Sequence, residues 1–162
     1  MGNIDMKALF SLTYGMYIVS TDLEGRLNGQ IANTVMQITS EPVCVATCLN
    51  KANLTTDMVA KSGRFSVAIL EQDVPMTFIG QFGFKSGRDI DKMHDSGLTP
   101  VMVDGQPAFA EAELVLVCRK RCKSEIAPED ILQQEKLDRW YGDKDYNTMY
   151  TGEIAAAYRA GK

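Results

Sequence analysis

The stretch Asn28-Gly-Gln-Ile-Ala-Asn-Thr-Val-Met-Gln-Ile-Thr-Ser-Glu-Pro42 lies between two local signals that interrupt regular structure. Asn28-Gly29 predicts a tight turn, because both residue types tolerate positive φ. At the other end, Pro42 lacks a backbone donor and favours an extended Glu41. Between these signals, amides and hydroxyls are mixed with branched apolar side chains. The mixture suits a flat, mostly apolar ligand with a polar rim, and it also suits an ordinary edge strand after a hairpin turn.

Helix and strand signals extend from this stretch in both directions. Upstream, the spacing of apolar residues predicts a short helix over Asp5–Leu12, and Gly15–Ser20 predicts a first strand. Downstream, Val43–Leu49 is apolar on both faces and therefore belongs inside a barrel or beneath another layer. Capping residues and a following glycine predict a helix over Thr55–Ser62. Alternating apolar residues then predict a strand over Arg64–Leu70.

The second half of the chain continues the same pattern of short elements. We expect a helix from Pro75 to about Phe82, a strand over Thr99–Val103, a long strand over Ala108–Cys122, a polar insertion or lid over Ser124–Tyr146, and a closing strand over Tyr150–Tyr158. Many short strands with few helices favour a β-barrel covered by one or two helices. At 162 residues, without a repeat or a linker, the chain is expected to form a single domain over residues 1–162.

Composition excludes several classes of function. The net charge is −4, whereas a protein that binds the nucleic-acid backbone usually has a basic surface, so no nucleic-acid partner is expected. No apolar run approaches the length of a membrane span, and the N-terminus lacks the layout of a signal peptide. We therefore expect a cytoplasmic protein with no membrane partner.

The four cysteines form two Cys-x3-Cys pairs, Cys44 with Cys48 and Cys118 with Cys122. A metal site made of four thiolates is one interpretation. Both pairs lie in apolar, strand-like runs, however, where residues four apart share a face and cysteines serve as small buried apolar side chains. We favour the second interpretation, with no metal site and with free thiols in a reducing compartment.

Two segments are candidates for an anion site. The predicted helix start at Lys51–Thr55 points unpaired N–H groups toward any neighbouring anion. The glycine-punctuated loop Gly83–Lys92 carries Arg88, which can reach the same anion. A solvated helix cap and a surface loop whose Arg88 pairs with an aspartate are the plainer explanations. The only histidine, His94, follows this loop without a nucleophile or a second ligand, so it supports no catalytic prediction.

A dimer is expected from the long strand over Ala108–Cys122. Val115 and Val117 share the strand face that carries Glu111 and Arg121. This half-apolar outer face is better covered than exposed to water. The strand therefore predicts a homodimer.

Two sequence blocks resemble those of the flavin reductase-like, FMN-binding split-barrel family. The first is the run from Leu27 to Pro42, and the second is Phe82-Gly-Phe-Lys-Ser-Gly-Arg-Asp-Ile-Asp-Lys-Met93. Together with the segments between and before them, the match covers roughly Met6 to Met93. A weaker similarity to the family's last barrel strand appears over Asp145–Ile154.

The resemblance implies a mainly β, Greek-key split barrel with a few short covering helices, which dimerises and holds FMN near the subunit interface. It also implies a flavin reductase or flavoredoxin-like oxidoreductase. Such a protein takes hydride or electrons from NAD(P)H, through bound FMN, to a flavin or to a redox-protein acceptor. The flavin would carry the chemistry, which agrees with the lack of a catalytic triad or paired acids in the sequence.

The family's cofactor contacts transfer onto ten residues. By position, Asn33, Thr34, Val35 and Met36 would line the isoalloxazine ring. The phosphate end would be surrounded by Asn50, Lys51, Thr55, Ser86, Arg88 and Lys92. No catalytic residue is assigned, and the segment Ser124–Tyr146 fits the family only loosely.

Three alternatives stay open at the level of sequence. One is an FMN-binding electron carrier without catalysis of its own, reduced by a separate reductase. Another is a metal protein with cysteine ligands. The third is an oxidase of the pyridoxine-phosphate-oxidase type, which shares the split barrel but oxidises a pyridoxine substrate.

Overall fold

The computed structural model describes residues 15–70, 77–142 and 146–159 of the chain. The predicted helix over Asp5–Leu12 and the predicted helix start at Pro75 lie outside these residues. The strands are β1 (Tyr17–Leu23), β2 (Arg26–Ala32), β3 (Val35–Ser40), β4 (Val43–Asn50), β5 (Arg64–Leu70), β6 (Pro100–Val103), β7 (Gln106–Phe109), β8 (Ala112–Glu125) and β9 (Asn147–Arg159). The helices are α1 (Leu54–Ser62), α2 (Phe78–Phe84), α3 (Lys92–Asp95) and α4 (Leu137–Trp140), with short 3-10 turns η2 (Pro128–Asp130) and η3 (Gln134–Lys136).

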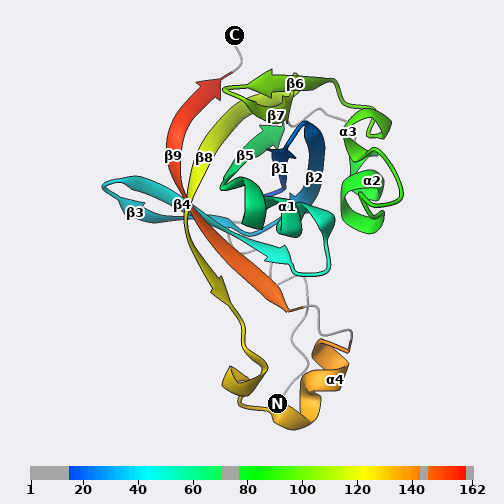
Figure 1. Ribbon diagram of the computed structural model, residues 1–162, viewed down its shortest axis with the longest axis vertical. Coiled ribbons are helices and arrows are strands. Elements are labelled where there is room, and N and C mark those ends of the chain that lie inside the picture. The colour runs from blue at the N-terminus through cyan, green and yellow to red at the C-terminus, as the bar shows by residue number, and fades with distance from the viewer. Residues whose placement is uncertain (1–14, 71–76, 143–145, 160–162) are drawn as a thin grey trace.

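Seven strands form one antiparallel sheet in the order β2-β1-β5-β8-β9-β4-β3, and β6 pairs with β7 in a separate hairpin. The sheet is strongly curved (Figure 1), and its two edge strands, β2 and β3, follow one another in the sequence. Helix α1 packs on β1 and β2, while α2 and α3 cover β2. This architecture confirms the predicted mainly β split barrel with short covering helices.

The central strands of the sheet are buried on both faces. One core cluster joins Ile18 of β1 and Ala68 of β5 to two of the three phenylalanines of α2, Phe78 and Phe82. The other cluster lies on the opposite face, where Val19 and Val67, the sequence neighbours of Ile18 and Ala68, pack with residues that include Val59 of α1 and Tyr150 of β9. The two faces are therefore covered by different elements, one by α2 and the other by α1 together with β9.

This two-sided burial corrects the basis of the dimer prediction. Val115 and Val117 were expected on an outer, half-apolar face. They are instead 5% and 0% exposed and belong to the core cluster formed with α2. The opposite face, with Leu116 and Cys118, packs into the second cluster. The interior part of β8 therefore offers no face for a partner.

The turn predicted at Asn28-Gly29 is wrong. Both residues lie inside β2, where they pair with Thr21 and Ser20 of β1. The hairpin turn lies earlier, at Glu24-Gly25, where both residues have positive φ angles of 54° and 85°. The tendency of Asn-Gly to turn is overridden here by pairing along the whole length of β1.

Other boundaries shift by smaller amounts. The single strand expected over Ala108–Cys122 is divided between β7 and β8, and β8 continues to Glu125. His94 lies in the short helix α3 rather than in a loop. The cysteines are free thiols, as expected, but only Cys44 and Cys118 are buried; Cys48 is partly exposed and Cys122 is exposed.

Candidate functional site

A cavity of about 410 Å³ opens where the sheet edges approach the start of α1, and we call it the amide cavity. Its side chains come from the ends of β2 and β4, from the β2–β3 connection, from the residues before α1, and from α2 and β9. Among the described lining residues, five carry a carboxamide and none carries a charge. The full set of described lining residues is Met16, Gln30, Ile31, Ala32, Asn33, Thr34, Cys48, Asn50, Asn53, Ile79 and Asn147. Such a lining offers donors and acceptors to a neutral ligand.

Gln30 differs from the other carboxamides of this cavity in its burial. It is only 3% exposed, and its Oε1 has no hydrogen-bond partner within the described part of the chain. Sequence reasoning missed Gln30, Cys48, Asn53 and Asn147. The available signal for Gln30 was its spacing, because it lies two positions from both Asn28 and Ala32. These two residues share its side of β2 and are buried.

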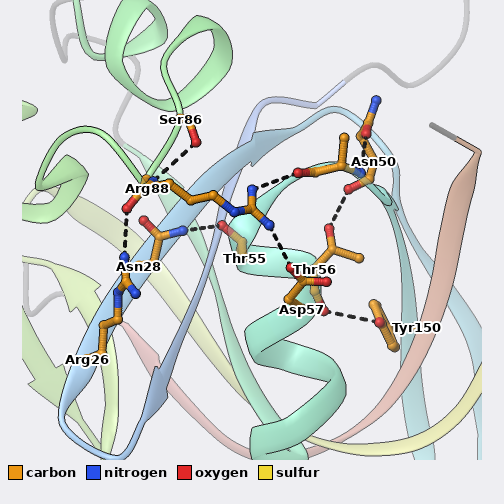
Figure 2. A network of polar contacts seen from close by, with 11 residues as sticks. Arg26, Asn28, Asn50, Thr55, Thr56, Asp57, Ser86, Arg88 and Tyr150 are labelled. Carbon is orange, nitrogen blue, oxygen red and sulfur yellow. Dashed lines mark hydrogen bonds and ion pairs between the residues drawn. The ribbon is translucent and has the colours of Figure 1, made fainter. Parts of the chain in front are cut away.

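Asn50 connects the amide cavity to the start of α1. Its Oδ1 accepts a hydrogen bond from the N–H of Ala52 at 2.8 Å, and its backbone carbonyl accepts one from Thr56 Oγ1 at 2.6 Å. The carbonyl of Thr56 in turn accepts a bond from the hydroxyl of Tyr150 at 3.2 Å (Figure 2). These contacts fix the end of β4, the first turn of α1 and β9 relative to one another.

Arg88 brings the loop after α2 to the same place. Its Nη1 donates to the carbonyl of Ala52 at 2.8 Å, and its Nη2 forms an ion pair with Asp57 Oδ2 at 2.7 Å. The loop itself is turned by Ser86, whose Oγ accepts from the N–H of Arg88 at 3.1 Å (Figure 2). The ion pair with an aspartate matches the plainer explanation given for Arg88, while its position beside the helix start matches the predicted anion site.

The loop fits against β2 through a close glycine contact. Asn28, itself 3% exposed, donates from Nδ2 to Thr55 Oγ1 at 2.8 Å. A Cβ on Gly87 would lie 2.2 Å from Asn28 Oδ1, so no larger residue fits there without movement. Arg26 adds a bond from Nη2 to the carbonyl of Gly87 at 3.1 Å.

The structure brings together most of the ten residues predicted to bind a cofactor. Asn33, Thr34 and Asn50 line the amide cavity. Thr55 lies in the first turn of α1, Lys51 precedes that helix, and Arg88 binds Ala52 and Asp57 beside it. Ser86 is joined to this group through the N–H of Arg88. The two groups meet at Asn50 and Ala52.

Three predicted residues lie elsewhere. Val35 packs on the core, and Met36, on the outer part of β3, is 48% exposed; neither lines the amide cavity. Lys92 is 4% exposed and donates from Nζ to the carbonyl of Phe82 at 3.2 Å. Burial lowers the pKa of Lys92, and its amine supports the end of α2 rather than the start of α1.

A second cavity, of about 460 Å³, lies between the β1–β2 turn and the residues before α3. It is strongly charged, with Arg26, Arg88, Asp89, Asp91 and His94 among its lining residues. His94 Nδ1 lies 2.9 Å from Asp91 Oδ2, and the same carboxylate caps α3. This cavity contains none of the residues predicted to line a flavin ring.

Two further observations concern metals and membranes. Within residues 15–70, 77–142 and 146–159, no group of three or more His, Cys, Asp and Glu side chains is placed to hold a metal ion. None of the helices in these ranges is long and apolar enough to cross a bilayer.

The chain is similar to two proteins whose names describe redox functions. A protein of Moorella thermoacetica named High molecular weight rubredoxin is 45% identical over 118 residues, which are 68% of this chain and 51% of that protein. The chain thus spans about half the length of that relative. Ferric-chelate reductase (NAD(P)H) of Archaeoglobus fulgidus is 45% identical over 121 residues, which are 71% of this chain and 72% of the relative.

The fold has close counterparts among solved structures. Flavoredoxin from Methanosarcina acetivorans superposes with a TM-score of 0.73 at 21% identity, covering 98% of this chain and 76% of the other. A family model described as flavin reductase like domain matches residues 9–155. The chain therefore belongs to the flavin reductase like domain family.

Proposed function

We propose that this protein is an NAD(P)H-dependent oxidoreductase that holds FMN in the amide cavity and beside α1. The observation that carries the proposal is the continuity of the two places. Asn50 lines the cavity and bonds to Ala52, and the carbonyl of Ala52 holds the Arg88 guanidinium. A neutral ring system and a phosphate joined by a short chain would occupy such a site from one end to the other.

The residues of the amide cavity fit a flavin ring. Its volume of about 410 Å³ lies in the range of small-molecule sites. The uncharged carboxamides suit the several oxygen and nitrogen atoms of the ring edge, and Ile31 and Ile79 suit its apolar part. The unpartnered Oε1 of Gln30 is a buried acceptor that a bound ligand would satisfy.

The proposed phosphate site beside α1 favours FMN over FAD. We assign the phosphate to the first turn of α1, together with Ser86 and Arg88, because helix N–H groups and a guanidinium attract a phosphate dianion. Arg88 is already fixed between Ala52 and Asp57, which leaves a compact site suited to a terminal phosphate. A dinucleotide would have to pass this arginine.

The chain's own residues would position the reactants rather than transfer protons. Bound flavin supplies the hydride and electron chemistry. Among the described side chains that line the amide cavity, the thiol of Cys48 is the only titratable group, and burial raises its pKa. The protein's contribution is therefore orientation, hydrogen bonding and exclusion of water.

The electron acceptor is proposed from the relatives. The names of the two relatives point to a ferric chelate in one case and to a rubredoxin in the other. We propose a free flavin or a redox protein as acceptor, with NAD(P)H as donor. The similarity to a rubredoxin also supports a second candidate, an FMN-binding electron carrier that a separate reductase reduces.

We further propose that two copies associate through β3 and its hairpin with β4. This hairpin projects from the body of the sheet (Figure 1), and it exposes Met36, Ile38 and Val43 by 48%, 45% and 46%. An exposed apolar edge strand invites pairing with another chain.

Four free cysteines suit a reducing compartment, and we propose the cytoplasm.

Purified protein tests the central proposal. We expect the yellow colour of bound flavin, FMN rather than FAD after denaturation and chromatography, and bleaching on anaerobic addition of NADH or NADPH. Protein that stays colourless after incubation with FMN contradicts the proposal. Bound FMN that bleaches only with an added reductase supports the electron carrier instead.

A further inference from the structure

Gln30 combines deep burial with an unsatisfied acceptor. Its side chain is 3% exposed, and its Oε1 has no donor within the described residues. A buried acceptor that loses water without gaining a donor is costly, so native structures nearly always supply one. The position of Gln30 therefore calls for a donor from beyond the described residues, and a ligand in the amide cavity could supply it.

The amide cavity is where such a donor would come from. Other buried polar atoms also lack a partner within the described residues, on Ser20, Thr47, Arg64, Gln81 and Gln106. None of these five residues lines the amide cavity, whereas Gln30 does. Among the described residues, Gln30 is therefore the only one that brings an unsatisfied buried polar atom to the proposed ring site.

The chemistry of the flavin ring limits which atom can meet this oxygen. In the oxidised isoalloxazine, N1, O2, O4 and N5 are acceptors, and the imide N3–H is the only donor of the ring system. A carboxamide presents an oxygen acceptor beside an NH2 donor, so it can pair with N3–H and with a neighbouring carbonyl oxygen at once. No other edge of the oxidised ring offers that combination.

We infer that Gln30 recognises the imide edge of the flavin, with its Oε1 accepting the hydrogen bond from N3–H. This inference rests on the proposed function and adds a residue that selects the ligand. N3 keeps its hydrogen in both oxidised and reduced flavin. The acceptor contact to N3–H is therefore available in both redox states, unlike a contact to N5.

The test compares FMN with 3-methyl-FMN, in which a methyl group replaces the N3 hydrogen. We expect wild-type protein to bind FMN about tenfold more tightly, as measured by quenching of flavin fluorescence. In Gln30→Met, which keeps a similar side-chain shape without the hydrogen bond, FMN affinity should fall about tenfold and the preference should disappear.

Gln106→Met is the matched control, because Gln106 is also buried, at 4% exposure, and also has an unpartnered Oε1, but lies outside the cavity. This variant should keep the full preference for FMN. Equal binding of both flavins by wild-type protein overturns the inference while leaving the proposed function intact. A preference that persists in Gln30→Met also overturns it. Failure of wild-type protein to bind either flavin overturns the proposed function together with the inference.

Discussion

At the scale of single residues, Arg88 is the side chain on which the phosphate assignment depends. Charge-assisted contacts to a phosphate contribute about 1.5–3 kcal/mol each. Arg88→Ala should therefore weaken FMN binding by roughly ten- to a hundredfold. Riboflavin lacks the phosphate, so its affinity should hardly change. Titrating both proteins with both flavins measures the contrast, and equal weakening of the two ligands would mean general damage to the site.

Substitution of Asp57 should change FMN affinity in the opposite direction and therefore serves as a control. Its carboxylate pairs with Arg88 at 2.7 Å and would repel a phosphate in the same place. Asp57→Asn should strengthen FMN binding by a few fold at low salt. Because both side chains of the pair are about half exposed, loss of the pair itself should change the free energy of unfolding by less than about 1 kcal/mol. Weaker FMN binding by this variant would contradict the assignment.

Cys118 predicts a dependence of stability on alkaline pH. Burial, aided by Cys44, raises the pKa of its thiol from 9.0 to about 12. Between these values the unfolded chain loses the proton while the folded chain keeps it, so stability is full below pH 9 and falls above it. By pH 10.5 the loss should approach about 2 kcal/mol.

Urea unfolding at pH 8 and pH 10.5 measures this loss. The fall in the free energy of unfolding should be smaller in Cys118→Ala than in wild type, whatever the variant's stability at pH 8. Cys122→Ala, which replaces an exposed thiol, should keep the wild-type fall. The same fall in Cys118→Ala as in wild type would show that the Cys118 thiol titrates normally in the fold.

At the scale of elements, two glycines in neighbouring segments predict opposite outcomes. Gly87→Ala would place a Cβ 2.2 Å from Asn28 Oδ1 and should cost about 1–3 kcal/mol of stability, with weaker FMN binding. Gly80 lies in α2 with nothing within 4 Å of its added Cβ, so Gly80→Ala should stabilise the protein by about 0.5–1 kcal/mol. Thermal unfolding separates the two, and a stable Gly87→Ala would mean that the loop does not rest on β2.

The elements that could be predicted from sequence are those with clear local signals. Helix α1 begins and ends within one residue of the prediction, because Asn53 occupies its N-cap and Gly63 its left-handed C-cap. Strand β5 matches the predicted range. Each signal acts within a few residues, so no tertiary contact is needed to read it.

What depends on long-range contacts could not be predicted. The faces of β8 were assigned wrongly because both are buried, and alternation identifies a water-facing side only where one exists. Gln30 was missed for a related reason, because a glutamine in a strand ordinarily faces water. Lys92 was grouped with Arg88 by the family resemblance, whereas helix α3 turns its side chain inward.

At the scale of the whole molecule, the β3–β4 hairpin predicts the state of association. We expect wild-type protein to sediment as a dimer at micromolar concentration, and Ile38→Lys to sediment as a monomer because a charge would be buried in the interface. Met102→Lys is the control, since Met102 is 52% exposed on β6, a strand of the other sheet. A wild-type monomer, or a dimeric Ile38→Lys, would exclude this hairpin as the interface.

The position of β9 has a consequence for how the chain is made. β9 pairs with β8 on one side and with β4 on the other, although β4 is translated in the first third of the sequence. While the ribosome adds the intervening elements, one side of the apolar strand β4 has no partner and can bind other unfinished chains or a chaperone. The nascent protein therefore cannot complete its sheet strand by strand. The sheet becomes continuous only when β9 inserts between β4 and β8, which are both translated before it.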